Sequence, residues 1–396
     1  MAEHVVVVVT GGVAAFKSLE VVRELLERGY EVATVMTEAA EHFLGAQSLA
    51  SVGHMNPSRG LFGTSPSPHT ELAEWADLFV VVPATADFLA KMAHGQADDL
   101  ATTSLLAFDG PVIVAPAMHS AMWEAPATQR NVTTLIGDGV HVVGPTNGRL
   151  AGGDVGVGRL VDPLWIVEAV RYWLSETPRS LVGLSITVSA GGTREPIDAV
   201  RYIGNRSSGR QGFALAQVAA IAGAAVRCVA TVDPPFPPDL IEVIRVETAV
   251  EMLEAMLEDQ HDADVLIMSA AVADFRVQEP FAGKVKRAGK ERLELALVAN
   301  PDVLVELVRH RSEDQIIVGF AAEVENLEAS VASKLASKGV DLMVGNNVQA
   351  PGTAFGSPDN AVYLLDRTGR ASWVPLAAKA EVASAILTAI AVLVKV

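Results

Sequence analysis

Five consecutive valines, Val5–Val9, constrain the fold of the first half of this chain more than any other feature. A continuous β-branched run is typical of a strand that is buried on both faces of a parallel sheet. Thr10-Gly11-Gly12 follows the run, and apolar residues then recur at helical spacing as far as Leu26. Three later apolar runs also end in small or polar residues: Val32–Met36, Leu78–Val82 and Val112–Ala115. This alternation predicts an α/β fold whose parallel strands carry ligand-binding residues at their carboxyl ends.

The stretch Ser189–Gly212 shows a related pattern in the second half of the chain. A short apolar strand ends at Gly191-Gly192, where the absence of side chains lets the backbone approach an anion closely. A second polar loop, Asn205–Gly209, then opens an apolar helix that includes Phe213. Backbone amides at a helix N-terminus favour negative charge, so the stretch predicts a phosphate-binding site.

Length and composition set the broad class of the protein. A chain of 396 residues predicts two domains, and a polar linker around 175–180 separates residues 1–176 from residues 181–396. The net charge of −17 argues against binding to nucleic acid or to anionic membranes, so phosphorylated substrates need local cationic pockets. Cys228 is the single cysteine, which excludes an internal disulfide. No signal-peptide pattern and no apolar run of roughly 18 residues is present, so we expect a cytoplasmic protein.

The Ser189–Gly212 stretch resembles the phosphate loops of the phosphopantothenate–cysteine ligase family. Bacterial members of that family are usually fused behind a flavin-dependent phosphopantothenoylcysteine decarboxylase. The resemblance implies a Rossmann-like domain that activates 4′-phosphopantothenate with CTP as an acyl-cytidylate and then joins it to cysteine. The CTP-binding residues that it implies are Gly191, Gly192, Ser207, Ser208, Gly209, Met268, Ser269, Ala270, Asp274, Lys284, Pro301, Asp302, Val303, Leu304, Phe320, Lys334 and Lys338.

The same resemblance implies chemical roles for three residues. Asn205 contacts the acyl-cytidylate and assists its conversion, and Lys284 with Mg²⁺ neutralises charge that builds on the phosphates. Lys284 opens the cationic run 284–287, which in so acidic a chain favours an anion site over a solvated charge run. Asp274 follows a buried strand and suits a ribose hydroxyl or a Mg²⁺ ion, although such a residue is by itself more often a cap. No side chain dictates the choice of cytosine.

The first half resembles the homo-oligomeric flavin-containing cysteine decarboxylases, a flavodoxin-like family. The loop Thr10–Ala14, the segment Pro83–Ala86 and the motif Pro116–Trp123 carry this resemblance. His69 matches the active-site histidine of the family, although a histidine at a helix start is more often a surface residue. The FMN-binding residues that the resemblance implies are Thr10, Gly11, Gly12, Val13, Ala14, Thr37, Ala84, Thr85, Ala86 and Met118.

Two positions depart from the pattern of the flavin family. Gly152 stands where the family has a cysteine in a flap over the active site, and His119 stands where an asparagine is usual. In the family, the flavin oxidises the substrate thiol, the carboxylate leaves as carbon dioxide, and the cysteine supplies a proton when the product is reduced again. General acid catalysis contributes roughly 100- to 10,000-fold, so another group must replace the thiol or this step is slow. Our hypothesis is that His119 or an ordered water replaces it.

The function predicted is therefore a bifunctional enzyme of coenzyme A biosynthesis with a flavodoxin-like FMN domain and a Rossmann-like ligase domain. One alternative keeps only the ligase activity, with the flavin domain impaired by Gly152 and serving as a scaffold. Another is a related cytidylate-forming amide synthetase, and a regulator that only binds nucleotide or flavin is a third. The resemblance also implies a homo-oligomer, plausibly a dodecamer built from trimers of flavin domains and dimers of ligase domains.

Overall fold

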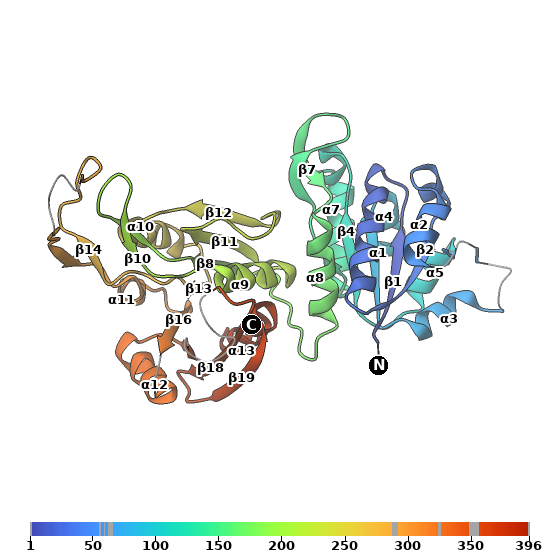
Figure 1. The fold of residues 1–396 in the computed structure, drawn as a ribbon. Helices are drawn as coiled ribbons and strands as arrows, with labels where there is room; N and C mark the ends of the chain where they lie inside the picture. The colour runs from blue at the N-terminus through green and yellow to red at the C-terminus, as the bar shows by residue number, and fades with distance from the viewer. Residues whose placement is uncertain are drawn as a thin grey trace. The chain divides into compact units, whose positions relative to one another are not determined.

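The computed structural model describes residues 2–54, 57–58, 60–61, 66–286, 292–323, 326–347 and 356–394. The chain forms two compact units, Met1–Pro178 and, apart from residues 221–223, Arg179–Val396. Each unit is a layered α/β structure with its own sheet (Figure 1). Among the described residues, no helix has the length and apolar character needed to span a membrane.

The first unit is built on a parallel sheet with the strand order β2-β1-β3-β4-β5. Strand β1 (His4–Val9) lies between β2 and β3, and all of its five valines are fully buried, as the sequence predicts. This is the flavodoxin-like order, and the direction of the chain across the sheet reverses between β1 and β3. The other strands are β2 (Glu31–Met36), β3 (Leu78–Ala84), β4 (Val112–Pro116) and β5 (His141–Val142).

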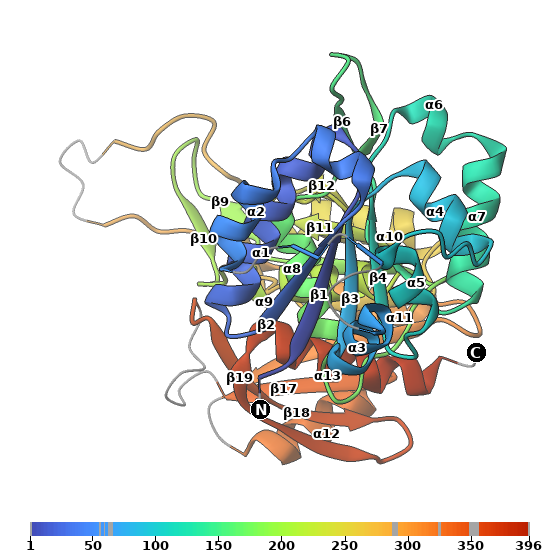
Figure 2. The ribbon, with the colours of Figure 1, turned by 90° about the vertical axis from the view of Figure 1, so that its right-hand side faces the viewer.

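Helices cover both faces of this sheet (Figure 1). They are the 3₁₀ helices η1 (Val13–Lys17) and η2 (Glu38–His42) and the helices α1 (Ser18–Glu27), α2 (Ala46–Gly53), α3 (Pro68–Trp75), α4 (Ala86–Ala93), α5 (Leu100–Leu106), α6 (Ser120–Trp123), α7 (Pro126–Gly137) and α8 (Pro163–Trp173). A hairpin of β6 (Thr146–Arg149) and β7 (Val155–Arg159) stands at the end of the unit where β1 and β3 finish (Figure 2). The sequence does not predict this hairpin, because its strands are short and rich in glycine.

The second unit has an eight-stranded sheet with the order β12-β11-β8-β13-β16-β17-β18-β19. The first six strands are parallel and follow the Rossmann order, with the reversal between β8 and β13. The last two are antiparallel and were not predicted. The strands are β8 (Ser185–Ala190), β11 (Ala225–Ala230), β12 (Ile241–Arg245), β13 (Val265–Met268), β16 (Ile316–Glu323), β17 (Leu342–Asn347), β18 (Asp359–Asp366) and β19 (Ala371–Ala378).

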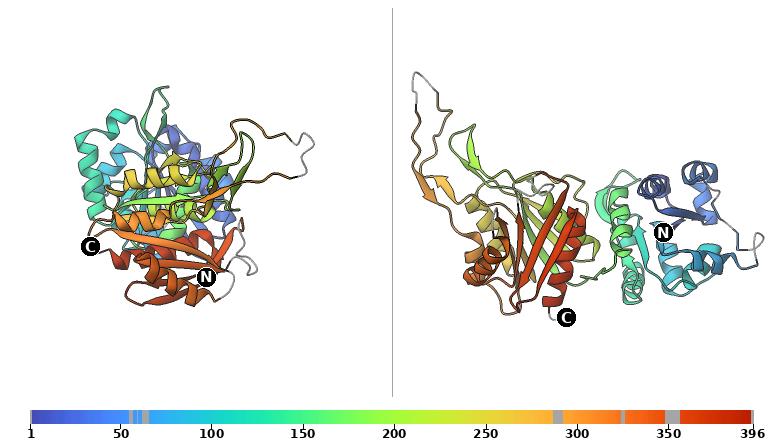
Figure 3. Two further views of the ribbon diagram at one scale, coloured as in Figure 1. Left: turned by 90° about the vertical axis from the view of Figure 1, so that its left-hand side faces the viewer. Right: turned by 60° about the horizontal axis from the view of Figure 1, so that its bottom comes forward.

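Helices also lie on both faces of the second sheet, as Figure 3 shows. They are α9 (Arg210–Ile221), α10 (Ala249–Gln260), α11 (Val303–Arg309), α12 (Leu327–Lys338) and α13 (Lys379–Leu393). Two small hairpins project together from one end of this unit (Figures 1 and 3), β9 (Arg194–Pro196) with β10 (Tyr202–Gly204) and β14 (Phe275–Val277) with β15 (Leu297–Ala299). Both sheets confirm the predicted fold class of two α/β domains with parallel strands.

Candidate functional sites

The first unit contains a cavity of about 1220 Å³ at the point where its strand order reverses. The loops after β1, β2, β3 and β4 and the hairpin β6–β7 line it, so carboxyl ends of parallel strands surround the space. This is the position where open α/β sheets bind their ligands. Its volume lies slightly above the usual range of about 300–1,000 Å³ for small-molecule sites.

Gly11 allows the loop after β1 to lie against the loop after β2. A Cβ atom at Gly11 would lie 2.4 Å from the Cβ of Ala39, a distance that real Cβ atoms do not reach. The next residue, Gly12, is the N-cap of η1 and caps it with no side-chain hydrogen bond. The start of η1 therefore meets the cavity with backbone only, which suits close approach of a phosphate.

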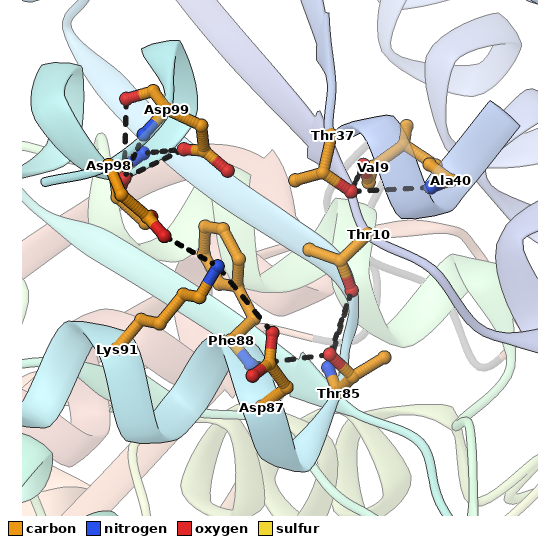
Figure 4. A network of polar contacts seen from close by, with 11 residues as sticks. Val9, Thr10, Thr37, Ala40, Thr85, Asp87, Phe88, Lys91, Asp98 and Asp99 are labelled. Carbon is orange, nitrogen blue, oxygen red and sulfur yellow. Dashed lines mark hydrogen bonds and ion pairs between the residues drawn. The ribbon is translucent and has the colours of Figure 1, made fainter. Parts of the chain in front are cut away.

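A polar network connects the loops around the cavity (Figure 4). The Thr10 hydroxyl donates to the carbonyl of Pro83 at 2.6 Å and accepts the N–H of Thr85 at 3.3 Å. Thr85 is in turn the N-cap of α4, and its hydroxyl accepts the N–H of Phe88. Thr37 caps η2 in the same way. The threonines thus fix the loop backbones on both sides of the reversal point.

Of the ten FMN-binding residues that the sequence predicts, all except Ala84 line this cavity. Ala84 is fully buried in β3, where its carbonyl accepts the N–H of Ala117. His69 does not line the cavity either. It lies in the first turn of α3, and its Nε2 is 3.5 Å from the Ser67 hydroxyl.

Several charged residues of the cavity are absent from the sequence-based prediction. Lys91 of α4 lies 3.1 Å from Asp98 and 3.8 Å from Asp87 (Figure 4). Burial lowers the pKa of Lys91, but the bond to Asp98 and the charge of Asp87 outweigh this effect and raise it. Lys17, Arg149 and Arg159 also line the cavity. Their spacing in the sequence carries no common pattern, so only the fold brings these cations together.

His119 lies at the mouth of the same cavity as the N-cap of α6. Its Nδ1 accepts the N–H of Ala121 at 3.2 Å, and its Nε2 lies 3.0 Å from a carboxylate oxygen of Asp154. Gly158 lets β7 lie close to the loop after β4, because a Cβ at Gly158 would lie 2.2 Å from the carbonyl oxygen of Met118. Met118 donates its N–H to the carbonyl of Gly158 at 2.9 Å. The structure therefore brings His119, Met118 and Gly152 to one cavity, as the sequence predicts.

In the second unit, two predicted phosphate loops meet at the reversal point between β8 and β13. Gly191 has φ +95°, and a Cβ there would lie 2.2 Å from the Thr231 hydroxyl oxygen. Gly209 has φ +72°, and a Cβ there would lie 3.2 Å from the backbone nitrogen of Gly191. Both positions therefore require glycine for conformation and for space. The N-terminus of α9 follows Gly209 directly.

A third loop, after β13, joins these two. The N–H of Ala271 donates to the carbonyl of Gly191 at 2.8 Å, and the Asn205 side-chain amide donates to the carbonyls of Ala271 and Val272 at 3.2 and 3.0 Å. Thr193 is fully buried, and its hydroxyl accepts the N–H of Ala273. Thr193 therefore holds the loops after β8 and β13 together, and its hydroxyl is not available to a ligand.

The predicted lysines of α12 face two carboxylates. Lys334 lies 2.6 Å from Glu323 at the end of β16, and the bond from Lys334 holds the pKa of Glu323 below its usual range. Lys338 pairs with Asp302, the N-cap of α11. Phe320 on β16 is half-buried. By contrast, Met268 and Val303 are buried in the core, so their side chains support the site and only their backbones can face a ligand.

Lys284 lies apart from these lysines, on the long connection between β14 and β15. Its neighbour Val285 is held from both sides: the backbone N–H donates to Asp198 at 3.0 Å and the carbonyl accepts from Arg201 at 2.8 Å. The N–H of Phe281 also donates to the carbonyl of Ile197 at 2.9 Å. The connection is thereby fixed to the 197–201 turn while Lys284 and Lys286 stay exposed. Arg287, the last cation of the predicted run, lies outside the described residues.

Asp198 is the centre of this attachment. Its side chain is fully buried, and it accepts the backbone N–H groups of Val200 and Arg201 in addition to that of Val285. The bond from the Arg201 guanidinium holds the pKa of Asp198 well below its usual range, although burial acts in the opposite direction. The sequence does not predict this role of Asp198, because an aspartate in a turn carries no signal of its hydrogen-bond partners.

Asp274 is exposed at the end of the loop after β13, and its carbonyl accepts the N–H of Asn300. No cluster of three histidine, cysteine, aspartate or glutamate side chains that could hold a metal ion occurs within the described ranges. Mg²⁺ is usually bound through one or two carboxylates together with substrate phosphates and water. A single exposed carboxylate fits that mode, and a site formed by protein groups alone is not observed in the described part of the chain.

The two halves of the chain match different family models. Residues 1–175 match the family described as Flavoprotein, and residues 181–393 match the DNA/pantothenate metabolism flavoprotein C-terminal domain. A crystal structure of the C-terminal domain of a coenzyme A biosynthesis bifunctional protein CoaBC is 34% identical and covers 53% of this chain and 95% of that one, with a TM-score of 0.45.

Two relatives match the chain over most of its length. The coenzyme A biosynthesis bifunctional protein CoaBC of Mycobacterium tuberculosis is 42% identical over 406 aligned residues, which cover 98% of this chain and 96% of that protein. The protein of the same name from Vibrio parahaemolyticus is 40% identical over 361 residues and covers 90% of each chain. The family resemblance drawn from the sequence is thus confirmed. The chain belongs to the family of bifunctional enzymes of coenzyme A biosynthesis.

Proposed function

We propose that the second unit joins 4′-phosphopantothenate to cysteine with CTP and that the first unit, with FMN bound, decarboxylates the product to 4′-phosphopantetheine. The observation that supports this most is the coincidence, in each unit, of the predicted phosphate loops with the reversal point of the sheet. Neither set of residues is contiguous in the sequence, and each gathers around one edge of its own sheet. No described feature favours an enzyme with ligase activity alone.

The first unit has the shape and chemistry that FMN requires. The cavity exposes bare backbone at Gly11 and Gly12 for the phosphate and places Lys17 near that loop, and Thr10 and Thr85 hold the loop walls. When bound, FMN supplies the two-electron chemistry that turns the substrate thiol into an electron-withdrawing group and later returns the electrons. The protein's own part is to orient the substrate, to exclude water with the β6–β7 hairpin, and to handle the protons at His119.

The second unit activates a carboxylate, which is by itself a poor electrophile. The carboxylate oxygen of 4′-phosphopantothenate attacks the α-phosphate of CTP, pyrophosphate leaves, and a mixed anhydride with CMP forms. Backbone N–H groups of the glycine loops and the N-terminus of α9 receive the phosphates. Lys334 and Lys338 exchange their carboxylate partners, Glu323 and Asp302, for phosphate oxygens. Asp274 would hold a Mg²⁺ ion, which would neutralise charge on the phosphates.

The cysteine amine then attacks the anhydride carbonyl, and CMP leaves. Asn205 is positioned for this step because its amide is held against the carbonyls of Ala271 and Val272, which leaves its side-chain oxygen free to face the intermediate. Lys284 reaches the phosphates from the connection between β14 and β15, which Asp198 and Arg201 hold in place. In this proposal the chain works in the cytoplasm as a homo-oligomer, a dodecamer of flavin-domain trimers and ligase-domain dimers.

The test is an end-to-end assay in which the purified protein receives CTP, Mg²⁺, cysteine and 4′-phosphopantothenate. We expect pyrophosphate, CMP, carbon dioxide and 4′-phosphopantetheine, each resolved by mass. The protein as purified should also be yellow from bound flavin. Absence of pyrophosphate release from CTP would remove the ligase proposal, and absence of carbon dioxide from added phosphopantothenoylcysteine would remove the decarboxylase proposal.

A further inference from the structure

The turn that connects β6 to β7 holds Gly152 and Asp154 in one short, closed loop. The N–H of Leu150 donates to the carbonyl of Asp154 at 2.8 Å, and the N–H of Gly153 donates to the carbonyl of Leu150 at 3.0 Å. Gly153 has φ +94°, which few other residues adopt. Leu150, Ala151 and Gly152 line the cavity of the first unit. The loop therefore presents a fixed backbone to the cavity.

The carboxylate of Asp154 fills the space that a side chain at Gly152 would take. A Cβ atom at Gly152 would lie 2.9 Å from Oδ1 of Asp154. The other oxygen, Oδ2, is the one that lies 3.0 Å from Nε2 of His119. One carboxylate, that of Asp154, therefore contacts His119 and also occupies the space beside Gly152.

The contacts of His119 assign its two ring nitrogens. Nδ1 accepts the N–H of Ala121, so in the neutral ring the proton is on Nε2 and points to Asp154. Both side chains are about half exposed, so the pair can exchange protons with water.

We propose that His119 is the proton donor of the flavin cavity and that Asp154 is the positioning residue that orients it. The proposal rests on the proposed decarboxylase function. After carbon dioxide has left, the carbon that carried it in the ene-thiolate takes one proton from the imidazolium. The two electrons taken from the thiol return with the other hydrogen as hydride, which leaves the saturated thiolate. The thiolate and His119 then each take a proton from water.

The first test compares Asp154→Asn with the unchanged chain in single turnovers on phosphopantothenoylcysteine. We expect carbon dioxide release within a few-fold of normal, a final reduction slowed by about 100-fold, and accumulation of a product lighter by two hydrogen atoms. Asp154→Glu should restore most of the rate, and Asp138→Asn, an exposed carboxylate at the end of α7, should change nothing.

A second measurement does not depend on turnover. In the full chain labelled with ¹⁵N at its histidines, NMR should show the His119 ring proton on Nε2, and the Nε2 signal should shift in Asp154→Asn and stay unchanged in Asp138→Asn. The signal is assigned by its loss in His119→Ala. This measurement also decides the question if Asp154→Asn binds flavin poorly, since it needs neither flavin nor substrate.

Two results would overturn the pairing of His119 with Asp154: an unchanged His119 ring signal in Asp154→Asn, or formation of the saturated product by that variant at the normal rate. Failure of the proposed function is a separate result. It would appear as no carbon dioxide from the unchanged chain, while the His119 ring signal would still report whether Asp154 contacts the ring.

Discussion

At the scale of single residues, the two candidate sites depend on glycines that no other residue can replace without strain. Gly191 illustrates this, because it combines φ +95° with a Cβ position 2.2 Å from the Thr231 hydroxyl oxygen. That hydroxyl donates to the carbonyl of Gly192 at 2.8 Å, so a methyl group would disturb the next peptide as well. Conformation and packing therefore act together at this position.

Gly191→Ala should destabilise the second unit by about 2–4 kcal/mol, the sum of a left-handed backbone penalty and a displaced Thr231. Gly183→Ala is the matched control, since Gly183 has φ +86° but no atom within 4 Å of its Cβ position. It should show the backbone penalty alone, about 1–2 kcal/mol. Calorimetric unfolding of the two variants measures the difference in stability loss. Equal losses of stability would mean that the Thr231 side chain moves aside at no measurable cost.

Lys284 is the residue whose loss should harm ligation most. Lys284→Ala should raise the KM for CTP, lower the rate of cytidylate formation, or both, with a combined loss of about 100-fold. Lys286→Ala is the control, because Lys286 is the exposed cation on the other side of the held Val285. Pyrophosphate release at varied CTP measures both parameters, and nearly normal ligation by Lys284→Ala would refute the assignment.

At the scale of elements, the connection between β14 and β15, which carries Lys284, is held by the turn of the hairpin β9–β10. Asp198→Asn keeps the shape of the side chain but loses the charge that Arg201 and three backbone N–H groups share. We expect faster hydrogen exchange at the Val285 amide and cytidylate formation reduced by about 10- to 100-fold through misplacement of Lys284. Asp262→Asn, an exposed carboxylate after α10, is the control. Slow exchange at Val285 together with reduced ligation would place the effect of Asp198 elsewhere.

The packing of α8 on the sheet of the first unit should depend on pH. The ring of His141 on β5 stacks on Trp173 of α8 at 3.3 Å and 6°, and burial lowers the pKa of His141 from 6.5 to about 4. The fold holds the neutral ring, so its contribution is complete above pH 6.5 and declines as the pH falls toward 4. The loss is at most about 3 kcal/mol, and smaller because the ring is partly exposed.

Urea unfolding followed by tryptophan fluorescence tests this between pH 7 and pH 4, since Trp75, Trp123, Trp165 and Trp173 all lie in the first unit and only Trp373 lies in the second. His141→Phe keeps a flat ring that cannot take up a proton. Stability of that variant should fall less over the same range, and an identical pH dependence in both chains would exclude His141 as the cause.

At the scale of the whole molecule, the family assignment and the two compact units indicate two reactions that separate by point substitution. The chain with Lys284→Ala should still release carbon dioxide from added phosphopantothenoylcysteine at the normal rate. The chain with His119→Ala should still make phosphopantothenoylcysteine from CTP, cysteine and 4′-phosphopantothenate. Loss of both activities in either variant would show that the units depend on each other.

Much of the fold could be predicted from local pattern. The valines of β1, the apolar runs of the parallel strands and the glycine pair after β8 each carry a signal in a few adjacent residues. The antiparallel strands β18 and β19 are not predicted from the sequence. Strand β19 is largely exposed, and Pro375 lies within it. The contact of Asp154 with His119 is not predicted either, because the two residues lie far apart in the chain.

The sequence by itself determined which loops follow buried strands and which of them contain glycine, threonine or lysine, because these properties depend on neighbouring residues alone. Only the tertiary structure decided that Ala84, Met268 and Val303 turn into the core, that Thr193 supports loops, and that the connection carrying Lys284 is bonded to Asp198. Side-chain direction and pairing between distant residues follow from strand order and packing. These arise only when the sheet has assembled, so no short stretch of sequence contains them.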